Sequence, residues 1–448
     1  MIWIRTRWAA LAVATSAFTL MFPSVHSMVL LSLVILVSTI RNVRWGISAW
    51  LLAFSGTALV GPQVDGLPVL YLPALLVGAA VHAPRMQFRR DLAVRLALPL
   101  VTVGVLVLVS TLLNRHLTSI NAAIAFVSIL VAAALIAHAI AVSSLAWRDF
   151  LWALSIGGMF LALLSLSEAH DLSRLGVDGR IRALANVVAL PLTAGIIALL
   201  LRRDTVSRRE NVFLVVTATV LGGTLFLTVS RGALVSVLGA VTAAILFSLS
   251  MVVWRRRVIR RWVDRLFGIV GVIVAVAGGT WSVLHGLGTS GDMVTQRFRQ
   301  EALGAGLQIR MDLWSSVLRA MLAEQPWIGH GLGGFRYLAG LQGSDFYAHS
   351  VFVDVTVAGG VIAGVALISL LAYGLFLSFQ VGEPIALALL IFACLSYATH
   401  GEANSPYFWI TIGLAFGLIS NPSSDQVRAQ PGPNRVKYHD FTEYISQR

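Results

Sequence analysis

The sequence predicts an all-α fold, a polytopic bundle of transmembrane helices. Composition, hydropathy and the placement of charge each indicate it. Hydrophobic residues make up 57% of the 448 residues and charged residues only 12%, with a mean hydropathy of +0.83. Soluble domains carry about 25% charged residues, so this chain has too little polar surface to face water. Lipid is the alternative solvent, and a helix needs about 20 mostly apolar residues to cross it.

Apolar segments of roughly that length recur along the chain and predict about 12 to 14 spans. We expect a transmembrane bundle over residues 1–287, a large outer loop over 288–348, C-terminal transmembrane helices over 349–420 and a tail over 421–448. The predicted spans are 8–23, 27–40, 45–60, 67–82, 93–113, 120–144, 150–166, 183–201, 211–229, 232–253, 266–287, 349–379, 385–399 and 406–420.

Charge placement predicts the orientation of these spans. The net charge is +13, but the basic residues fall in short clusters between apolar segments, which excludes a continuous surface for nucleic acid and indicates topology signals instead. With both termini in the cytoplasm, the clusters beginning at Arg41, Arg85, Arg148, Arg202 and Arg255 all lie on the inner side. The single cysteine, Cys394, excludes an intrachain disulfide and a multi-cysteine metal site.

The outer loop at 288–348 is the longest stretch outside the predicted membrane. One part of it predicts an amphipathic helix that Arg310 opens and Pro326 ends, lying on the membrane or over a cavity. A loop helix that packs for stability alone is the alternative. The apolar residues at helical spacing are Leu313, Trp314, Val317, Leu318, Met321 and Leu322.

Arginines on the outer side depart from the inner-side pattern, and four of them are candidates for a binding site. Arg231 follows Ser230 at the turn between two apolar runs, and Arg180 and Arg182 precede the span at 183–201. A guanidinium near hydrocarbon is costly unless it is paired or reaches water. Together with Arg310, these side chains predict a site for a diphosphate, which a guanidinium binds bidentately. A snorkelling or solvated arginine is the alternative at each position.

His349 lies where the outer loop re-enters the membrane. An imidazole there can be neutral near pH 7 and accept a proton, so His349 is the candidate general base. A structural hydrogen-bonding role is the alternative, and His170 and His400 are further outer candidates.

A glycine-rich stretch follows Pro326, with glycines at 329, 331, 333 and 334. Its amides could bind sugar or phosphate, because glycine allows close backbone approach. The stretch could equally form a tight turn between loop helices, and its spacing does not decide between the two.

The ordered motifs resemble the superfamily of O-antigen ligases and O-antigen polymerases, bacterial membrane glycosyltransferases. They span about residues 180–370. In order, they are Ser230-Arg231-Gly232, Arg310-Met311-Asp312-Leu313-Trp314, the glycine-rich stretch from Pro326, Ala348-His349-Ser350 and Gly359-Gly360.

The resemblance implies a GT-C-related fold in the bacterial inner membrane, with the active site facing the periplasm. It implies transfer of a glycan from an undecaprenyl-diphosphate-linked donor to a glycan or glycolipid acceptor, with inversion and without a metal or other cofactor. His349 matches the catalytic histidine, Arg231 and Arg310 match diphosphate-binding arginines, and Arg180 or Arg182 matches a third. Membrane lipid is a further expected partner, and nucleic acid is not.

One residue departs from the family pattern: Ser350 stands where the family usually has Asn. The departure weakens assignment to the lipopolysaccharide ligases that use a lipid A-core acceptor, and a polysaccharide polymerase stays open. Two rival hypotheses are a SEDS-type peptidoglycan polymerase, which is expected to rely on a loop carboxylate, and a lipid or glycan flippase. Transporters usually show interrupted helices with polar residues at mid-membrane, whereas the polar residues here gather at the outer boundary.

Overall fold

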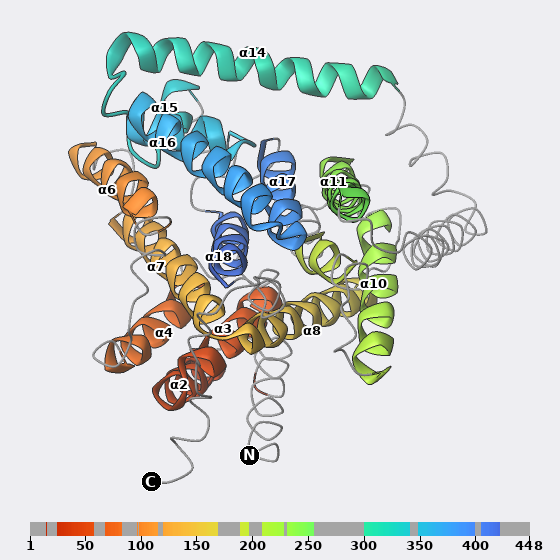
Figure 1. Ribbon diagram of the computed structural model, residues 1–448. Helices are drawn as coiled ribbons and strands as arrows, with labels where there is room; N and C mark the ends of the chain where they lie inside the picture. The colour runs from red at the N-terminus through yellow and green to blue at the C-terminus, as the bar shows by residue number, and fades with distance from the viewer. Residues whose placement is uncertain are drawn as a thin grey trace, which may run out of the picture.

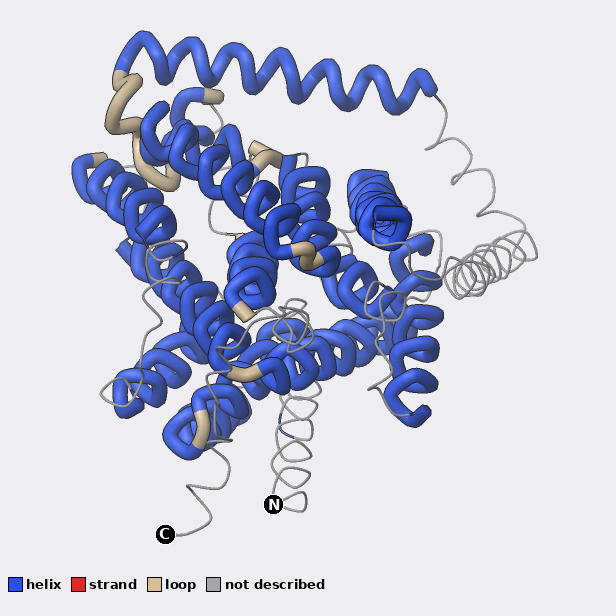
Figure 2. Tube along the Cα trace, in the orientation of Figure 1, coloured by secondary structure: helices blue, strands red, loops and turns tan. Residues whose placement is uncertain are grey.

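The computed structural model describes most of the chain as helices (Figures 1 and 2). Its described residues contain no strand, so the all-α prediction is confirmed for that part. Predicted spans 8–23 and 266–287 lie outside the described part, apart from Thr15, as do the tail beyond Asn421 and residues 288–299 and 341–347 of the outer loop. The described ranges are 25–57, 68–82, 98–114, 120–168, 189–196, 208–227, 231–254, 300–340, 348–398 and 405–421, with Thr15 and Leu96.

The described helices coincide with the predicted spans to within a few residues. Apolar sequence in lipid forms helices because every backbone polar group must then be satisfied inside the segment. The bundle helices are α2 (Val25–Arg41), α3 (Val43–Thr57), α4 (Pro68–His82), α6 (Leu98–Leu113), α7 (Ile120–Val142), α8 (Ser144–Glu168), α10 (Arg208–Leu227), α11 (Arg231–Trp254), α16 (Val351–Val381), α17 (Pro384–Ala398) and α18 (Pro406–Ser420).

By length and composition, three described stretches could each cross a membrane: Ala122–Val142, Gly232–Ser250 and Val351–Val381. Five shorter apolar helices accompany them in the described part of the chain. The protein is therefore a polytopic helical membrane protein. The predicted total of about 12 to 14 spans stays a prediction, because several of them fall outside the described ranges.

Helix α18 forms the centre of the bundle, with α7, α16 and α17 around it (Figure 1). Pro406 occupies the first turn, where its missing N–H costs nothing, and every residue from Tyr407 to Ser420 is buried. A Cβ at Gly413 would stand 2.5 Å from the carbonyl oxygen of Ala133, so α7 and α18 approach each other closely. Small residues permit such backbone contact between membrane helices.

Polar contacts between helices gather at two opposite ends of the bundle. At one end, Arg44 pairs with Asp149 at 2.7 Å and the Asn421 side-chain amide donates to the carbonyl of Ile140 at 2.6 Å. Asn114 and its partners lie at the other end of α6 and α7. Each group joins helix ends for which the sequence predicts the same side of the membrane, inner for the first group and outer for the second.

One predicted boundary is wrong: α8 begins at Ser144, six residues before the predicted span at 150. The first turns of this helix carry Arg148 and Asp149, which the hydropathy pattern assigns to a connection. Because Asp149 is paired with Arg44 of α3, the polar turns are stabilised at the end of the bundle.

Helix α16 is interrupted near its start. Gly360 has φ 77° and ψ 178°, which is non-helical, and the helix continues on both sides of it. This conformation is essentially restricted to glycine. The interruption frees backbone groups of the first part of α16, and another segment of the chain must satisfy them.

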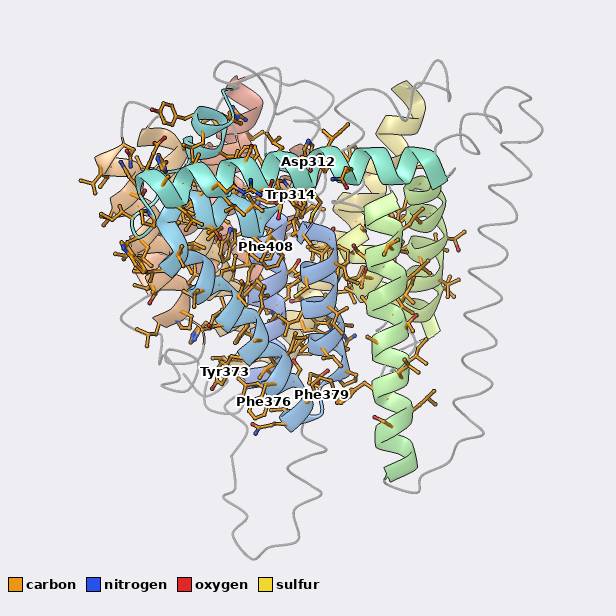
Figure 3. The ribbon with its side chains drawn as sticks, turned by 90° about the horizontal axis from the view of Figure 1, so that it is seen from above. Asp312, Trp314, Tyr373, Phe376, Phe379 and Phe408 are labelled. Atoms are coloured by element: carbon orange, nitrogen blue, oxygen red, sulfur yellow. The ribbon has the colours of Figure 1, made fainter. Side chains whose placement is uncertain are left out.

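The outer loop supplies α14 (Gln300–Glu324) and α15 (Gly334–Leu338). Figure 3 shows α14 running crosswise to the bundle helices, near the end where α16 begins. The helix ends before Pro326 as predicted, because proline disfavours helical backbone in the residue before it. The expectation that Arg310 opens this helix is wrong: α14 already begins at Gln300, so Arg310 lies well inside it.

Candidate functional site

A small second core holds the outer loop against the start of α16. Val317 of α14, Phe335 of α15, and Ala348 and Val357 beside and within α16 are all buried. Burial of each large apolar side chain stabilises the contact by about 1.5–3 kcal/mol. This cluster fixes α14 relative to the turn that contains His349.

The face of α14 that packs against the second core contains all but one of the apolar residues predicted for it. Val317 and Met321 are buried, and Leu313, Trp314 and Leu318 pack against the second core. Leu322, predicted on the same face, is 52% exposed. The helix ends two residues later, and the glycine-rich segment turns away there, so nothing described covers this side chain.

Trp314 makes the polar contact between α14 and the His349 turn. Its indole Nε1 donates a hydrogen bond of 2.6 Å to the carbonyl oxygen of Ala348, the residue before His349. Ala348 is 1% exposed, so this carbonyl would otherwise be buried without water as a partner. The bond therefore fixes the peptide that carries His349.

His349 adopts a left-handed backbone conformation, with φ 53°, and is half-buried. It is the one positive-φ residue other than glycine among the described residues. Such strain costs on the order of 1 kcal/mol or more and is frequent at functional sites. Here the fixed Ala348 carbonyl on one side and the start of α16 on the other hold the residue in place.

Ser350, where the resemblance leads us to expect Asn, lies at the start of α16. It is the N-cap of α16, with extended backbone, and its hydroxyl accepts from the amide of Val353 at 3.4 Å. Asn and Ser are about equally good N-caps. A serine therefore keeps the helix start that an asparagine would form, and His349 keeps its position before the cap.

Arg310 lies one helical turn before Trp314 on α14, and residues four apart share a helix face. Its side chain is half-buried. The structure thus brings the Arg310 face of α14 to the turn that carries His349. Of the other predicted cations, Arg231 begins α11, with its side chain outside the described part. Arg180, Arg182, His170 and His400 lie outside the described residues altogether.

Residues 326–332 of the glycine-rich segment form a clasp, a loop whose backbone bonds to neighbouring helices. This role favours a tight turn between loop helices over a site whose amides bind sugar or phosphate. Val357 and Ala358, on one side of the α16 interruption, accept hydrogen bonds from the amides of His330 (2.8 Å) and Gly331 (2.9 Å). Val361, on the other side, donates to the carbonyl of Pro326 at 2.9 Å. The loop therefore satisfies the groups that Gly360 removes from the helix.

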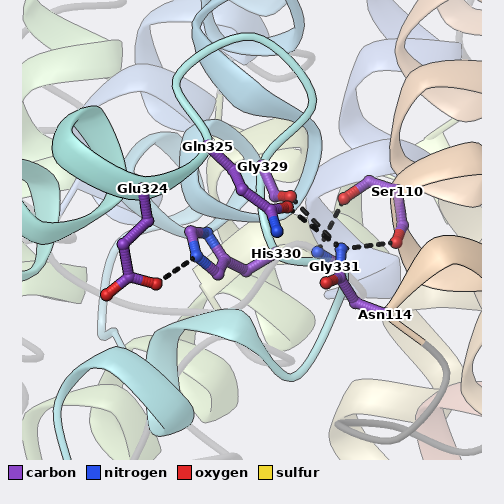
Figure 4. A network of polar contacts seen from close by, with 7 residues as sticks. All are labelled: Ser110, Asn114, Glu324, Gln325, Gly329, His330 and Gly331. Carbon is purple, nitrogen blue, oxygen red and sulfur yellow. Dashed lines mark hydrogen bonds and ion pairs between the residues drawn. The ribbon is translucent and has the colours of Figure 1, made fainter.

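The same segment also contacts the end of α6 (Figure 4). The Gly331 and Leu332 amides donate to the hydroxyls of Ser110 (2.8 Å) and Thr111 (3.1 Å), and the Asn114 side chain donates to the Gly329 carbonyl at 3.3 Å. These amides are used within the protein. Binding of sugar or phosphate by the amides at 330–332 is thus not supported.

Sequence reasoning did not identify two buried ionisable side chains, His330 and Asp354, as candidates. His330 is 2% exposed in the clasp, with Nε2 3.1 Å from a carboxylate oxygen of Glu324 (Figure 4). Asp354 is buried in the first turn of α16, where the positive end of the helix dipole favours a carboxylate. A charged residue inside an apolar run is a signal that could have identified Asp354.

Residues 213–368 match the O-antigen ligase family. The matched segment runs from α10 into α16, so it contains Arg231, Arg310, the clasp and His349, and the resemblance expected from the sequence is confirmed there. It begins after Arg180 and Arg182. No curated protein and no solved structure matches the chain.

The O-antigen ligase match supports an activity of the O-antigen ligase or polymerase type, with a lipid-linked glycan substrate in general terms. Among the described residues, no group of three His, Cys, Asp or Glu side chains could hold a metal ion. The independence from metal that the resemblance implies stays a prediction.

We expect Gly360→Ala to destabilise the protein by about 3 kcal/mol or more, because alanine is strained at this φ and ψ and its Cβ would meet the carbonyl of Trp327. Thermal unfolding in detergent measures the effect. Gly340→Ala has a positive φ but open space around it, and should cost about 1–2 kcal/mol. Gly195→Ala, helical with nothing within 4 Å of the new Cβ, is the control. Equal melting of all three variants would contradict the clasp.

Ser350→Ala should lower the free energy of unfolding by about 1 kcal/mol through loss of the N-cap. Ser350→Asn should retain it, because asparagine caps a helix equally well. Thermal unfolding of both variants against wild type is the measurement. An asparagine variant that melts with the alanine variant would show that capping is not what this position provides.

Proposed function

We propose that this protein is an O-antigen ligase-like glycosyltransferase of the bacterial inner membrane. It moves a glycan from an undecaprenyl-diphosphate-linked donor to an acceptor sugar at the periplasmic face. The observation that carries the proposal is the contact between Trp314 and Ala348, which joins the arginine-bearing helix α14 to the histidine-bearing turn. The O-antigen ligase match over this region supports it.

In the proposed reaction, His349 accepts the proton of the acceptor hydroxyl as its oxygen attacks the anomeric carbon of the donor. The bond from that carbon to the diphosphate oxygen breaks, and the electron pair leaves with the lipid diphosphate. Direct displacement inverts the anomeric configuration. The products are the new glycoside, undecaprenyl diphosphate and protonated His349.

The arginines have the complementary role. Negative charge develops on the departing diphosphate, and preorganised cations stabilise it strongly where water is excluded. Arg310 is carried on the α14 face that contacts the His349 turn. Arg231 and either Arg180 or Arg182 complete the proposed set, on the resemblance of their motifs.

The strained backbone of His349 supplies a sharp test of its catalytic role. His349→Asn should fold, because asparagine tolerates the left-handed conformation, but it cannot act as a base near pH 7. We expect transfer to fall by about 10²- to 10⁴-fold with little change in melting temperature. The assay uses purified protein in nanodiscs with lipid-diphosphate-linked oligosaccharide and several acceptors, without added metal.

The same assay separates the alternatives. Extension of the donor glycan itself would identify a polymerase, and transfer to a glycolipid acceptor a ligase. The anomeric configuration of the product, read by NMR, tests inversion. Full activity of His349→Asn would reject the mechanism, and movement of labelled lipid between leaflets without a new glycosidic bond would favour the flippase.

Trp314 is expected to be a positioning residue. Trp314→Phe keeps the ring in the second core but removes the donor to Ala348, which should cost about 1–3 kcal/mol of stability and lower kcat with little change in the donor KM. Leu318→Ala, which removes packing from the same cluster without touching that carbonyl, is the control. If both variants lose similar stability and kcat falls equally in both, Trp314 has no positioning role beyond its packing.

A further inference from the structure

The interruption at Gly360 divides α16 into two parts, and the second part is long enough to cross a membrane by itself. Residues 361–381 form 21 consecutive positions of the helix. At about 1.5 Å per residue this part is about 31 Å long, which matches the roughly 30 Å hydrocarbon thickness of a bilayer. With this part across the hydrocarbon, Gly360 would lie at the boundary between hydrocarbon and headgroups.

The tip of the clasp, Trp327-Ile328, lies against this point. A Cβ at Gly360 would meet the carbonyl of Trp327 and the amide of Ile328, so their backbones are in direct contact with the interruption. The flanking residues Pro326, His330 and Gly331 are fixed by hydrogen bonds to α16. The tip is thus held at a set height on the bundle.

Both side chains of the tip point away from the protein: Trp327 is 66% exposed and Ile328 48%. Directly below the tip, an exposed apolar stripe continues along α16 through Ile362, Val365 and Ile368. Helix α6, to which the clasp also bonds, ends with exposed Leu112 and Leu113. The stripe belongs to a helix long enough to cross the bilayer, so we expect acyl chains to cover it.

We propose that Trp327 and Ile328 insert into the headgroup region of the outer leaflet and form a membrane contact of the outer loop. Tryptophan favours this zone because one side of its ring is apolar and its N–H can bond to water or headgroups. The surface is continuous with the lipid-facing stripe of α16, which identifies lipid rather than another protein as the occupant. Lipid contact then holds the clasp at the membrane boundary and, through it, fixes the height of α14 above the membrane.

The single cysteine allows a direct test that does not depend on transferase activity, and so stands apart from the proposed function. In a Cys394→Ala background, one cysteine is placed at Trp327, and in separate variants at Ile328, Val365 or Ser316. Each is labelled with an environment-sensitive fluorophore. Nanodiscs that hold one copy of the protein contain phosphatidylcholine with a nitroxide either near the headgroup or near the middle of the acyl chain.

We expect the labels at 327 and 328 to be quenched about twofold or more over the label at 316, and more by the shallow than by the deep nitroxide. The label at 365 should show the opposite depth preference. Ser316, exposed on α14, reports a site off the tip. Quenching at 327 and 328 no greater than at 316 would overturn the proposal, as would protection from aqueous iodide that appears only when discs hold two copies. Size-exclusion elution of each variant confirms folding.

Discussion

The structure depends on how the backbone groups freed at one interrupted membrane helix find hydrogen-bond partners. Gly360 takes α16 out of helical conformation, and the freed groups of Val357, Ala358 and Val361 bond to the clasp. In a low-dielectric setting, unsatisfied backbone groups cost several kcal/mol each. The clasp is therefore a structural requirement of the membrane domain, and the loop cannot leave without exposing the interruption.

The proposed function depends on the residues that the clasp holds in place. The clasp continues directly from α14 into α15, so its attachment to α16 and α6 also fixes the second core. That core and the Trp314 bond to Ala348 hold His349 in a conformation that few residues adopt. The interruption differs from those of transporters, because it lies near one end of the helix and is filled by backbone amides rather than left open around a polar site.

The sequence predicts the helices well because membrane spans are determined by local hydropathy, and α14 shows its helical spacing of apolar residues plainly. The sequence does not predict features that depend on contacts with residues far away along the chain. The start of α8 depends on an ion pair with Arg44, and the exposure of Leu322 depends on where the chain turns next. The clasp role of residues 326–332 is a matter of backbone pairing with residues about 30 positions away, which no periodicity reveals. Arg310 and His349 were identified from their places in the outer loop and from motifs, whereas the bond from Trp314 to Ala348, which joins α14 to the His349 turn, was not predictable.

The lengths of the two parts of α16 bear on the proposed reaction. From Gly360 back to Val351 the helix rises by nine residues, or about 14 Å, if it continues along the same axis. His349 would therefore stand beyond the phosphate layer, level with the first sugars of a lipid-linked glycan rather than with its diphosphate. Long arginine side chains that reach down from α14 would cover the difference in height. Adding or removing one residue between His349 and Gly360 would both shift the imidazole by about 1.5 Å and rotate it by about 100° around the helix, so the length of this short segment is as constrained as its chemistry.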